Sequence, residues 1–331
     1  MFVGLQTSAD PVYILEIRND CLYSKHTGKT YQFDYDIVKP LLKGAEIKRY
    51  STPVEKYKII FPYRIINNSV KLLSKEELSR QYPLIWAYFL ECAEKLKGRE
   101  NGKMDIPEWW AFGRNQNLSC FARTKIMTQV LASHSSLTLD QDKEYYFVGG
   151  GTAGGYGIIL KEDSQISYTY LLGLLNSTLL EKYLQSYASP FKGGFFAYNR
   201  ESMSKLPIPP ATDEEKETIE KLVSYVLYLT EQFKNDSNSL MDKLMTRYFE
   251  QIIDALVLEL YLPEELHTHQ LYFSSLLHTE DLPLLKSIQD DKIAILRDVF
   301  KKLYAQDHPI RHSLFLLDTV KTVRIIGDKT V

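Results

Sequence analysis

Apolar and polar residues alternate in short runs through the first hundred residues, which is the pattern of half-buried strands. The runs VYILEI (12–17) and KYKIIFPY (56–63) are predicted strands, and a glycine turn in HTGKTYQF leads into a third. A brief helix is expected over residues 36–43, because Gly44 would end it.

The pattern becomes helical after Ser74. Ser74 is a favourable N-cap and Glu77 follows three residues later, so a capping box is predicted. Pro83 is expected to divide the helical segment in two. Strands return over residues 105–161, where KIMTQV and EYYFV carry the clearest strand pattern.

From Tyr168 to Tyr183 apolar residues recur every three or four positions, which predicts an amphipathic helix. LPIPP (206–210) interrupts this pattern, and a helix with an acidic first turn is expected from Asp213. The segment TVRII (322–326) is a predicted final strand.

These elements predict an α+β fold. A mixed α/β domain of short strands and packed helices is expected over residues 1–206, with two lobes divided near residue 100. A mainly helical region is expected over residues 207–331.

Charge is unevenly distributed along the chain, although the net charge is only −2. Residues 1–99 contain 16 Lys and Arg against 11 Asp and Glu, and residues 100–206 contain 10 of each. Residues 207–331 contain 14 against 21. A polyanion would therefore be better tolerated by the first part of the chain than by the last.

Composition narrows the class of protein. The 44% hydrophobic and 25% charged residues are ordinary for a soluble globular protein, and no apolar run approaches the length of a membrane span. The three cysteines form no CxxC pair, which indicates buried thiols in a reducing cytoplasm. The seven histidines have no metal-site grouping and no catalytic motif is present, so no catalytic, cofactor-binding or metal-binding residue is predicted.

The glycine-rich stretch VGGGTAGGYG (148–157) could in principle hold a phosphate or a cofactor. That chemistry requires the loop to open a helix, whereas here it leads into the strand-like GIIL. A strand–loop–strand structure is therefore predicted.

Two stretches, FGRNQNLSCFARTK (112–125) and SPFKGGFFAYNRESMSKLPIPP (189–210), are candidates for contact with a nucleic acid. Arg, Asn and Gln side chains have edges that suit guanine and adenine, and Lys192 beside two glycines can approach a phosphate closely. Each stretch also has a purely structural alternative. The first can be a polar turn whose amides bind its own backbone. In the second, the glycines can permit a tight strand entry and Asn199 can cap the next turn. The candidate residues are Arg114, Asn115, Gln116, Asn117, Lys125, Lys192, Gly193, Gly194, Tyr198, Asn199 and Arg200.

Seven longer stretches occur along the chain in this order: FVGLQTSADPVYIL, KPLLKGAEIKRY, FPYRIINNSVKLLS, WWAFGRNQNL, YYFVGGGTAGGYGIIL, LLGLLNSTLLEKYLQ and SPFKGGFFAYNRESMSKLPIP. Together they closely resemble the TaqI-like C-terminal specificity region of type II (IIG-like) restriction–modification enzymes. The resemblance covers roughly residues 2–262.

The resemblance implies a target recognition domain that grips double-stranded DNA and selects the sequence. The catalytic part, an adenine-N6 DNA methyltransferase that is often accompanied by a nuclease, would then flip an adenine into its pocket. This sequence lacks the Asn-Pro-Pro-Tyr motif of that methyltransferase. S-adenosylmethionine and Mg²⁺ are therefore implied for the parent enzyme rather than for this chain, whose partners would be duplex DNA and the parent's catalytic domain.

Three alternatives remain open at this point. The chain could be a stand-alone specificity subunit, a protein-interaction scaffold whose acidic helical tail docks a catalytic partner, or a small cofactor-binding enzyme that uses the loop at residues 149–157.

Overall fold

The structure is a computed structural model that describes residues 1–234, 240–289 and 291–327. These residues form two compact units, which are described separately. The first unit consists of residues 1–48, 52–131 and 140–159, and the second of residues 49–51, 132–139 and 160–327. Strands dominate the first unit and helices the second, so the predicted α+β class is confirmed.

The main sheet of the first unit has the strand order β12-β5-β6-β2-β3-β4. The pair β12 and β5 is parallel and the other neighbours are antiparallel. The strands are β2 (Ile14–Arg18), β3 (Cys21–Ser24), β4 (Thr30–Tyr31), β5 (Val38–Leu42), β6 (Tyr57–Ile60) and β12 (Tyr146–Phe147), and the short helix α1 (Asp10–Tyr13) precedes β2.

The predicted helix over residues 36–43 is wrong. The segment forms β5, which pairs with β6 from Val38 opposite Ile60 to Leu41 opposite Tyr57. Pro40 would disrupt a helix interior, and the ladder buries Leu41 and Leu42 fully. Gly44 opens the 3₁₀ helix η1 (Gly44–Glu46) instead of ending a helix.

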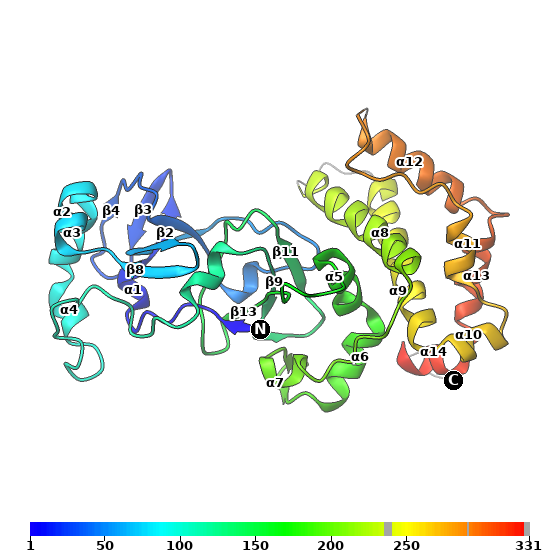
Figure 1. Ribbon diagram of the computed structural model, residues 1–331, viewed down its shortest axis with the longest axis horizontal. Coiled ribbons are helices and arrows are strands. Elements are labelled where there is room, and N and C mark those ends of the chain that lie inside the picture. The colour runs from blue at the N-terminus through cyan, green and yellow to red at the C-terminus, as the bar shows by residue number, and fades with distance from the viewer. Residues whose placement is uncertain (235–239, 290, 328–331) are drawn as a thin grey trace. The chain divides into compact units, whose positions relative to one another are not determined.

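Helices flank this sheet in the first unit, as Figure 1 shows for α2 and α3 beside β3 and β4. The Ser74 side chain accepts a hydrogen bond from the N–H of Glu77, whose carboxylate accepts one from the N–H of Ser74. The predicted capping box and the division at Pro83 are therefore confirmed. The helices are α2 (Lys75–Gln81), α3 (Pro83–Glu91) and α4 (Ala93–Lys97).

Two smaller β structures complete the first unit. Strand β13 (Gly155–Ile158) lies between β1 (Phe2–Val3) and β9 (Lys125–Gln129), antiparallel to both, and β7 (Tyr63–Ile66) pairs with β8 (Ser69–Leu72). The predicted strand at KIMTQV and the strand–loop–strand structure around the glycines are thus confirmed. Within EYYFV, only Tyr146 and Phe147 are assigned to a strand.

The second unit is built on two long helices, α8 (Asp213–Gln232) and α9 (Leu240–Tyr261), which pack side by side with α5 (Tyr168–Asn176) against α8 (Figure 1). The helix predicted from Tyr168 is interrupted at Ser177, whose side chain caps α6 (Thr178–Tyr187). The remaining elements are β14 (Pro190–Phe191), β15 (Phe195–Ala197), α7 (Arg200–Met203), α10 (Pro263–Thr268), α11 (Phe273–His278), α12 (Lys292–Leu303), α13 (Pro309–Leu317) and α14 (Lys321–Ile326).

The predicted strand TVRII is wrong, because these residues belong to α14. The predicted boundary between residues 206 and 207 is not one of the boundaries between the compact units described above. The two domains that it would separate stay a prediction. The strands β10 (Leu131–Ala132) and β11 (Leu137–Asp140) contain two of the points where the chain passes between the two units.

Candidate nucleic-acid interface

The loop Gly113–Asn117 belongs to the first unit, and its start is firmly attached. The N–H groups of Gly113 and Arg114 donate to the carbonyls of Thr7 and Gln6 at 3.1 and 3.0 Å. A Cβ at Gly113 would lie 2.6 Å from the Cβ of Ser8, so this close approach requires glycine.

A buried arginine that no sequence motif singles out supports the same loop. The Arg99 guanidinium donates to the carbonyls of Leu96, Thr7 and Trp109 at 2.7, 2.7 and 2.6 Å. It therefore joins the segment before the loop to the N-terminal segment that holds it.

The tip of this loop presents polar side chains to solvent. Arg114, Asn115, Gln116 and Asn117 are all exposed. Within the described chain, no hydrogen bond engages the side-chain amides of Asn115, Gln116 and Asn117. The alternative in which these amides bind their own backbone therefore has no support from the geometry.

Arg114 has a partner in the protein. Its Nη1 lies 2.8 Å from Oε1 of Glu100, which also accepts from the Ser8 hydroxyl at 3.2 Å. Because the Arg114 side chain is 54% exposed, a phosphate or a base could replace Glu100 at modest cost.

Lys125 does not belong to this exposed set. Its side chain is fully buried, forms an ion pair with Asp140 and donates to the carbonyl of Phe121 at 3.0 Å. Burial lowers the pKa of the Lys125 ammonium, and Asp140 opposes that shift. Asp140 also accepts the N–H groups of Glu144 and Tyr145. Lys125 therefore holds β9 to the turn after Asp140, and it has no surface with which to meet DNA.

The second candidate segment forms a hairpin in the second unit. Strands β14 and β15 pair with Phe191 opposite Phe195, and Lys192, Gly193 and Gly194 form the exposed turn between them. The glycines have φ values of +87° and +77°, a region that side chains rarely adopt. Nothing in the described chain pairs with the Lys192 ammonium, so the turn offers a cation and bare backbone together.

The residues that follow this hairpin divide between core and surface. Tyr198 is buried with its hydroxyl 3.4 Å from that of Ser135, and burial raises the pKa of the phenol to about 12. The side-chain Oδ1 of Asn199 accepts from the N–H of Ser202 at 2.9 Å and caps α7, as the structural alternative expected. Only Arg200 is exposed. Tyr198 is therefore a packing residue, and Asn199 already has a local function.

The hairpin also exposes two aromatic rings that were not among the candidates. Phe191 and Phe195 are 45% and 41% exposed, whereas Tyr198 is buried. Strand alternation in the sequence shows that some of these rings must face outward, but it does not show which.

The glycine-rich loop does not provide a cofactor site of the expected kind. It joins β12 to β13, so no helix N-terminus faces its N–H groups. Gly149 and Gly157 instead allow close packing, because a Cβ at either would lie 2.2–2.3 Å from an atom of Gly4 or Phe2. Among the described residues there is no group of acidic, His and Cys side chains that could hold a metal ion. The prediction of buried thiols holds for Cys92 but is wrong for Cys21 and Cys120, which are partly exposed.

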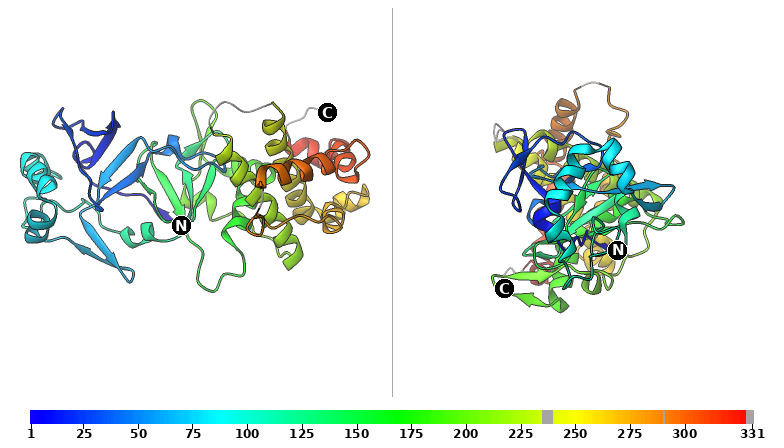
Figure 2. Two further views of the ribbon diagram at one scale, coloured as in Figure 1. Left: turned by 90° about the horizontal axis from the view of Figure 1, so that it is seen from above. Right: turned by 90° about the vertical axis from the view of Figure 1, so that its left-hand side faces the viewer.

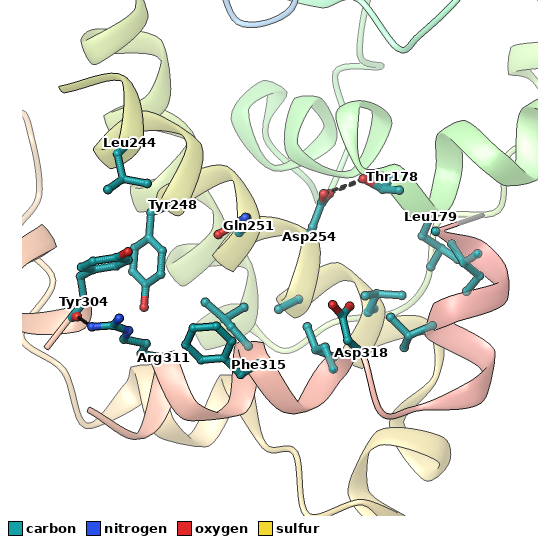
Figure 3. Close-up of a pocket in the computed structure, with 17 residues that line it drawn as sticks. Thr178, Leu179, Leu244, Tyr248, Gln251, Asp254, Tyr304, Arg311, Phe315 and Asp318 are labelled. Carbon is teal, nitrogen blue, oxygen red and sulfur yellow. Dashed lines mark hydrogen bonds between the residues drawn. The ribbon is translucent and has the colours of Figure 1, made fainter. Parts of the chain in front are cut away.

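A cavity of about 580 Å³ lies in the second unit between α6, α9, α13 and α14 (Figure 3). Oδ1 and Oδ2 of Asp254 accept from the N–H and hydroxyl of Thr178 at 3.0 and 2.7 Å, and burial raises the pKa of the carboxyl. Asp254 thus helps to start α6. None of the predicted DNA-contact residues lines this cavity.

No helix of the described chain is both long enough and apolar enough to cross a membrane.

Comparison with known proteins gives two matches. A family of sequences described as the TaqI-like C-terminal specificity domain matches residues 39–208. The chain is also 25% identical, over 269 residues, to the type II restriction enzyme and methyltransferase RM.Eco57I of Escherichia coli. That alignment covers 75% of this chain but only 27% of the relative.

Proposed function

Because the chain belongs to the family of TaqI-like C-terminal specificity domains, we propose that it is the part of a type II restriction–modification enzyme that recognises a DNA sequence. The observation that carries the proposal is the family match over residues 39–208, which includes both exposed segments described above. The ligand is double-stranded DNA.

The exposed loop of the first unit is suited to reading bases. Arg114, Asn115 and Gln116 stand on a backbone that hydrogen bonds to the N-terminal segment hold in place. Side chains on a rigid support lose less conformational freedom when they bind. Arginine can pair with guanine, and Asn or Gln with adenine, through two hydrogen bonds each.

The hairpin turn of the second unit is suited to phosphate. Lys192 and Arg200 are exposed cations, and Gly193 and Gly194 allow main-chain N–H groups to approach closely. Such contacts fix the position of the protein on DNA and make its affinity depend on salt, without selecting a sequence.

We propose that the catalytic step belongs to another part of the parent protein. The relative is named a restriction enzyme and methyltransferase, and this chain spans 27% of its length. The parent's methyltransferase domain would flip a target adenine that this chain holds in register, and its nuclease activity would need Mg²⁺. The cytoplasm, where the DNA lies, is the proposed location.

S-adenosylmethionine would supply the methyl group in that parent domain. The residues of this chain do not fit it, because the glycine loop at residues 149–154 opens a strand rather than a helix. We therefore derive no step of methyl transfer from this chain.

The experiment that tests the proposal is a selection from randomised duplexes with the full 331-residue chain. Repeated binding and amplification at low salt should enrich one sequence, and its affinity should fall as salt rises. A pool that stays random, or an affinity that is independent of salt, would overturn the proposal.

A further inference from the structure

Besides the loop Gly113–Asn117, the first unit has an exposed element to which the proposed function assigns no role. Strands β7 and β8 form a two-stranded ribbon that pairs with no other strand of the described chain. Only Asn67 and Asn68 connect them, with φ values of +47° and +63°. Such a two-residue turn matches the natural twist of a hairpin. Figure 2 shows the ribbon, in light blue at the lower left of its left-hand view, projecting from the body of its unit.

The two faces of the ribbon differ. Ile65, Val70 and Leu72 face the hydrophobic core and are partly buried against it. On the other face Arg64 lies opposite Lys71, and Ile66, which is 56% exposed, lies opposite Ser69. The outer face is therefore a polar and basic surface that ends in two exposed amides.

Charge around the ribbon favours an anionic partner. The ribbon itself, residues 63–72, contains two cations and no Asp or Glu. Arg64 is partly engaged, with Nη1 3.1 Å from Oε1 of Glu77. Lys71 forms no ion pair or hydrogen bond with a described residue, although its charge acts on the nearby Glu77 carboxylate. Two cations directly opposite each other on a ribbon repel, and Glu77 offsets only part of that repulsion.

The ribbon also supports the loop proposed to read bases. The Tyr63 hydroxyl accepts from the N–H of Phe112 at 2.7 Å, immediately before Gly113. On the other side of the loop, β8 packs against the 3₁₀ helix η2 (Leu118–Ala122). Both ends of the loop are thus attached to the ribbon, which places the two elements beside each other.

We propose that the β7–β8 ribbon enters the major groove of the bound duplex, where the amides of Asn67 and Asn68 read base edges and Lys71 meets a phosphate. The inference rests on the proposed function, since its ligand is duplex DNA. The major groove admits a two-stranded ribbon, and an Asn amide matches the donor and acceptor of adenine. The exposed Ile66 can contact a thymine methyl group in the same groove.

The test uses the full chain and the duplex enriched by selection, with a shuffled duplex of equal composition as competitor. The variant Asn67→Gly/Asn68→Gly removes both amides, while glycine retains the positive φ values. Asn19→Gly is the matched control, because Asn19 is exposed in the corresponding β2–β3 turn with φ +47°.

Discrimination is measured as the Kd for the shuffled duplex divided by the Kd for the selected duplex. This ratio should fall at least about tenfold in the double glycine variant, while binding to the shuffled duplex keeps its salt dependence. The Asn19→Gly control should keep the wild-type ratio. Lys71→Ala should weaken binding to both duplexes by the same factor. If the glycine variant unfolds, Asn67→Asp/Asn68→Asp provides a second test, because Asp tolerates the turn but lacks the amide N–H donors that pair with adenine, and should also reduce the ratio.

If the wild-type chain discriminates between the duplexes and a folded variant without the two Asn amides keeps the same ratio, the ribbon proposal alone is overturned. A wild-type chain that enriches no sequence overturns the proposed function, and the ribbon proposal with it.

Discussion

At the scale of single residues, exposure separates Lys192 from Lys125. Both are lysines near aromatic or apolar strand segments in the sequence, and both were candidates for DNA contact. Lys125 finds Asp140, fifteen positions later, in the core, whereas Lys192 stands in an open turn. Local sequence does not reveal such a distant partner, so the sequence could not distinguish the two roles.

The buried ion pair yields a stability prediction. Lys125→Met should lower the free energy of unfolding by about 3 kcal/mol, because it leaves Asp140 buried without its cation. Urea denaturation measures the change, with Lys143→Met as an exposed control that should alter stability little. A loss below about 1 kcal/mol would show that the backbone donors alone suffice for Asp140.

Lys192 yields a binding prediction. Lys192→Ala should weaken binding to every duplex by a similar factor and reduce the slope of log K against log salt by about one. The exposed Lys286→Ala in the acidic helical region is the control and should leave affinity unchanged. A loss confined to the selected duplex would instead assign Lys192 to base reading.

At the scale of elements, strong local signals predicted structure well. The Ser74 capping box, the division at Pro83 and the helix starting at Asp213 all have a side chain or ring that acts within one turn. The errors fall where tertiary pairing decides. Residues 38–42 become a strand because β6 lies beside them. Four of the five residues 322–326 are β-branched, and yet the segment belongs to the helix α14.

The capping box gives a pH dependence. The N–H of Ser74 holds the pKa of the Glu77 carboxyl below its ordinary value in the folded protein. A depressed pKa contributes stability above the unfolded value of about 4.3, and that contribution is lost as pH falls through the lower folded value. Wild type should therefore exceed Glu77→Gln in stability at pH 6, and the difference should shrink steadily towards pH 3. Urea denaturation measures the difference at each pH. A difference that stays constant between pH 6 and pH 3 would contradict the predicted loss of stability on protonation of Glu77.

At the scale of the whole molecule, family membership rests on the order of many segments rather than on one motif. The sequence could identify the family and the two exposed segments. It could not show that Tyr198 and Lys125 are buried or that the β7–β8 ribbon projects, because burial and projection depend on contacts between distant segments. The Asn-Asn pair between two apolar runs was a usable hairpin signal.

The proposal that methyl transfer belongs to another part of the parent protein gives a cofactor prediction. S-adenosylmethionine should leave the Tm of this chain unchanged, since its glycine loop opens a strand. A ligand at 100 times its Kd would add about 2.7 kcal/mol to the stability of the folded protein, which differential scanning fluorimetry detects easily. A clear rise in Tm would favour a cofactor-binding enzyme instead.

If this chain recognises a DNA sequence, duplexes of different sequence must compete unequally for it. The full chain is bound to the selected duplex and displaced by unlabelled selected or shuffled duplex at one fixed salt concentration. The proposed function predicts that the selected duplex competes at least about tenfold better, the discrimination expected from a single well-paired base contact. Equal competition by the two duplexes would contradict it.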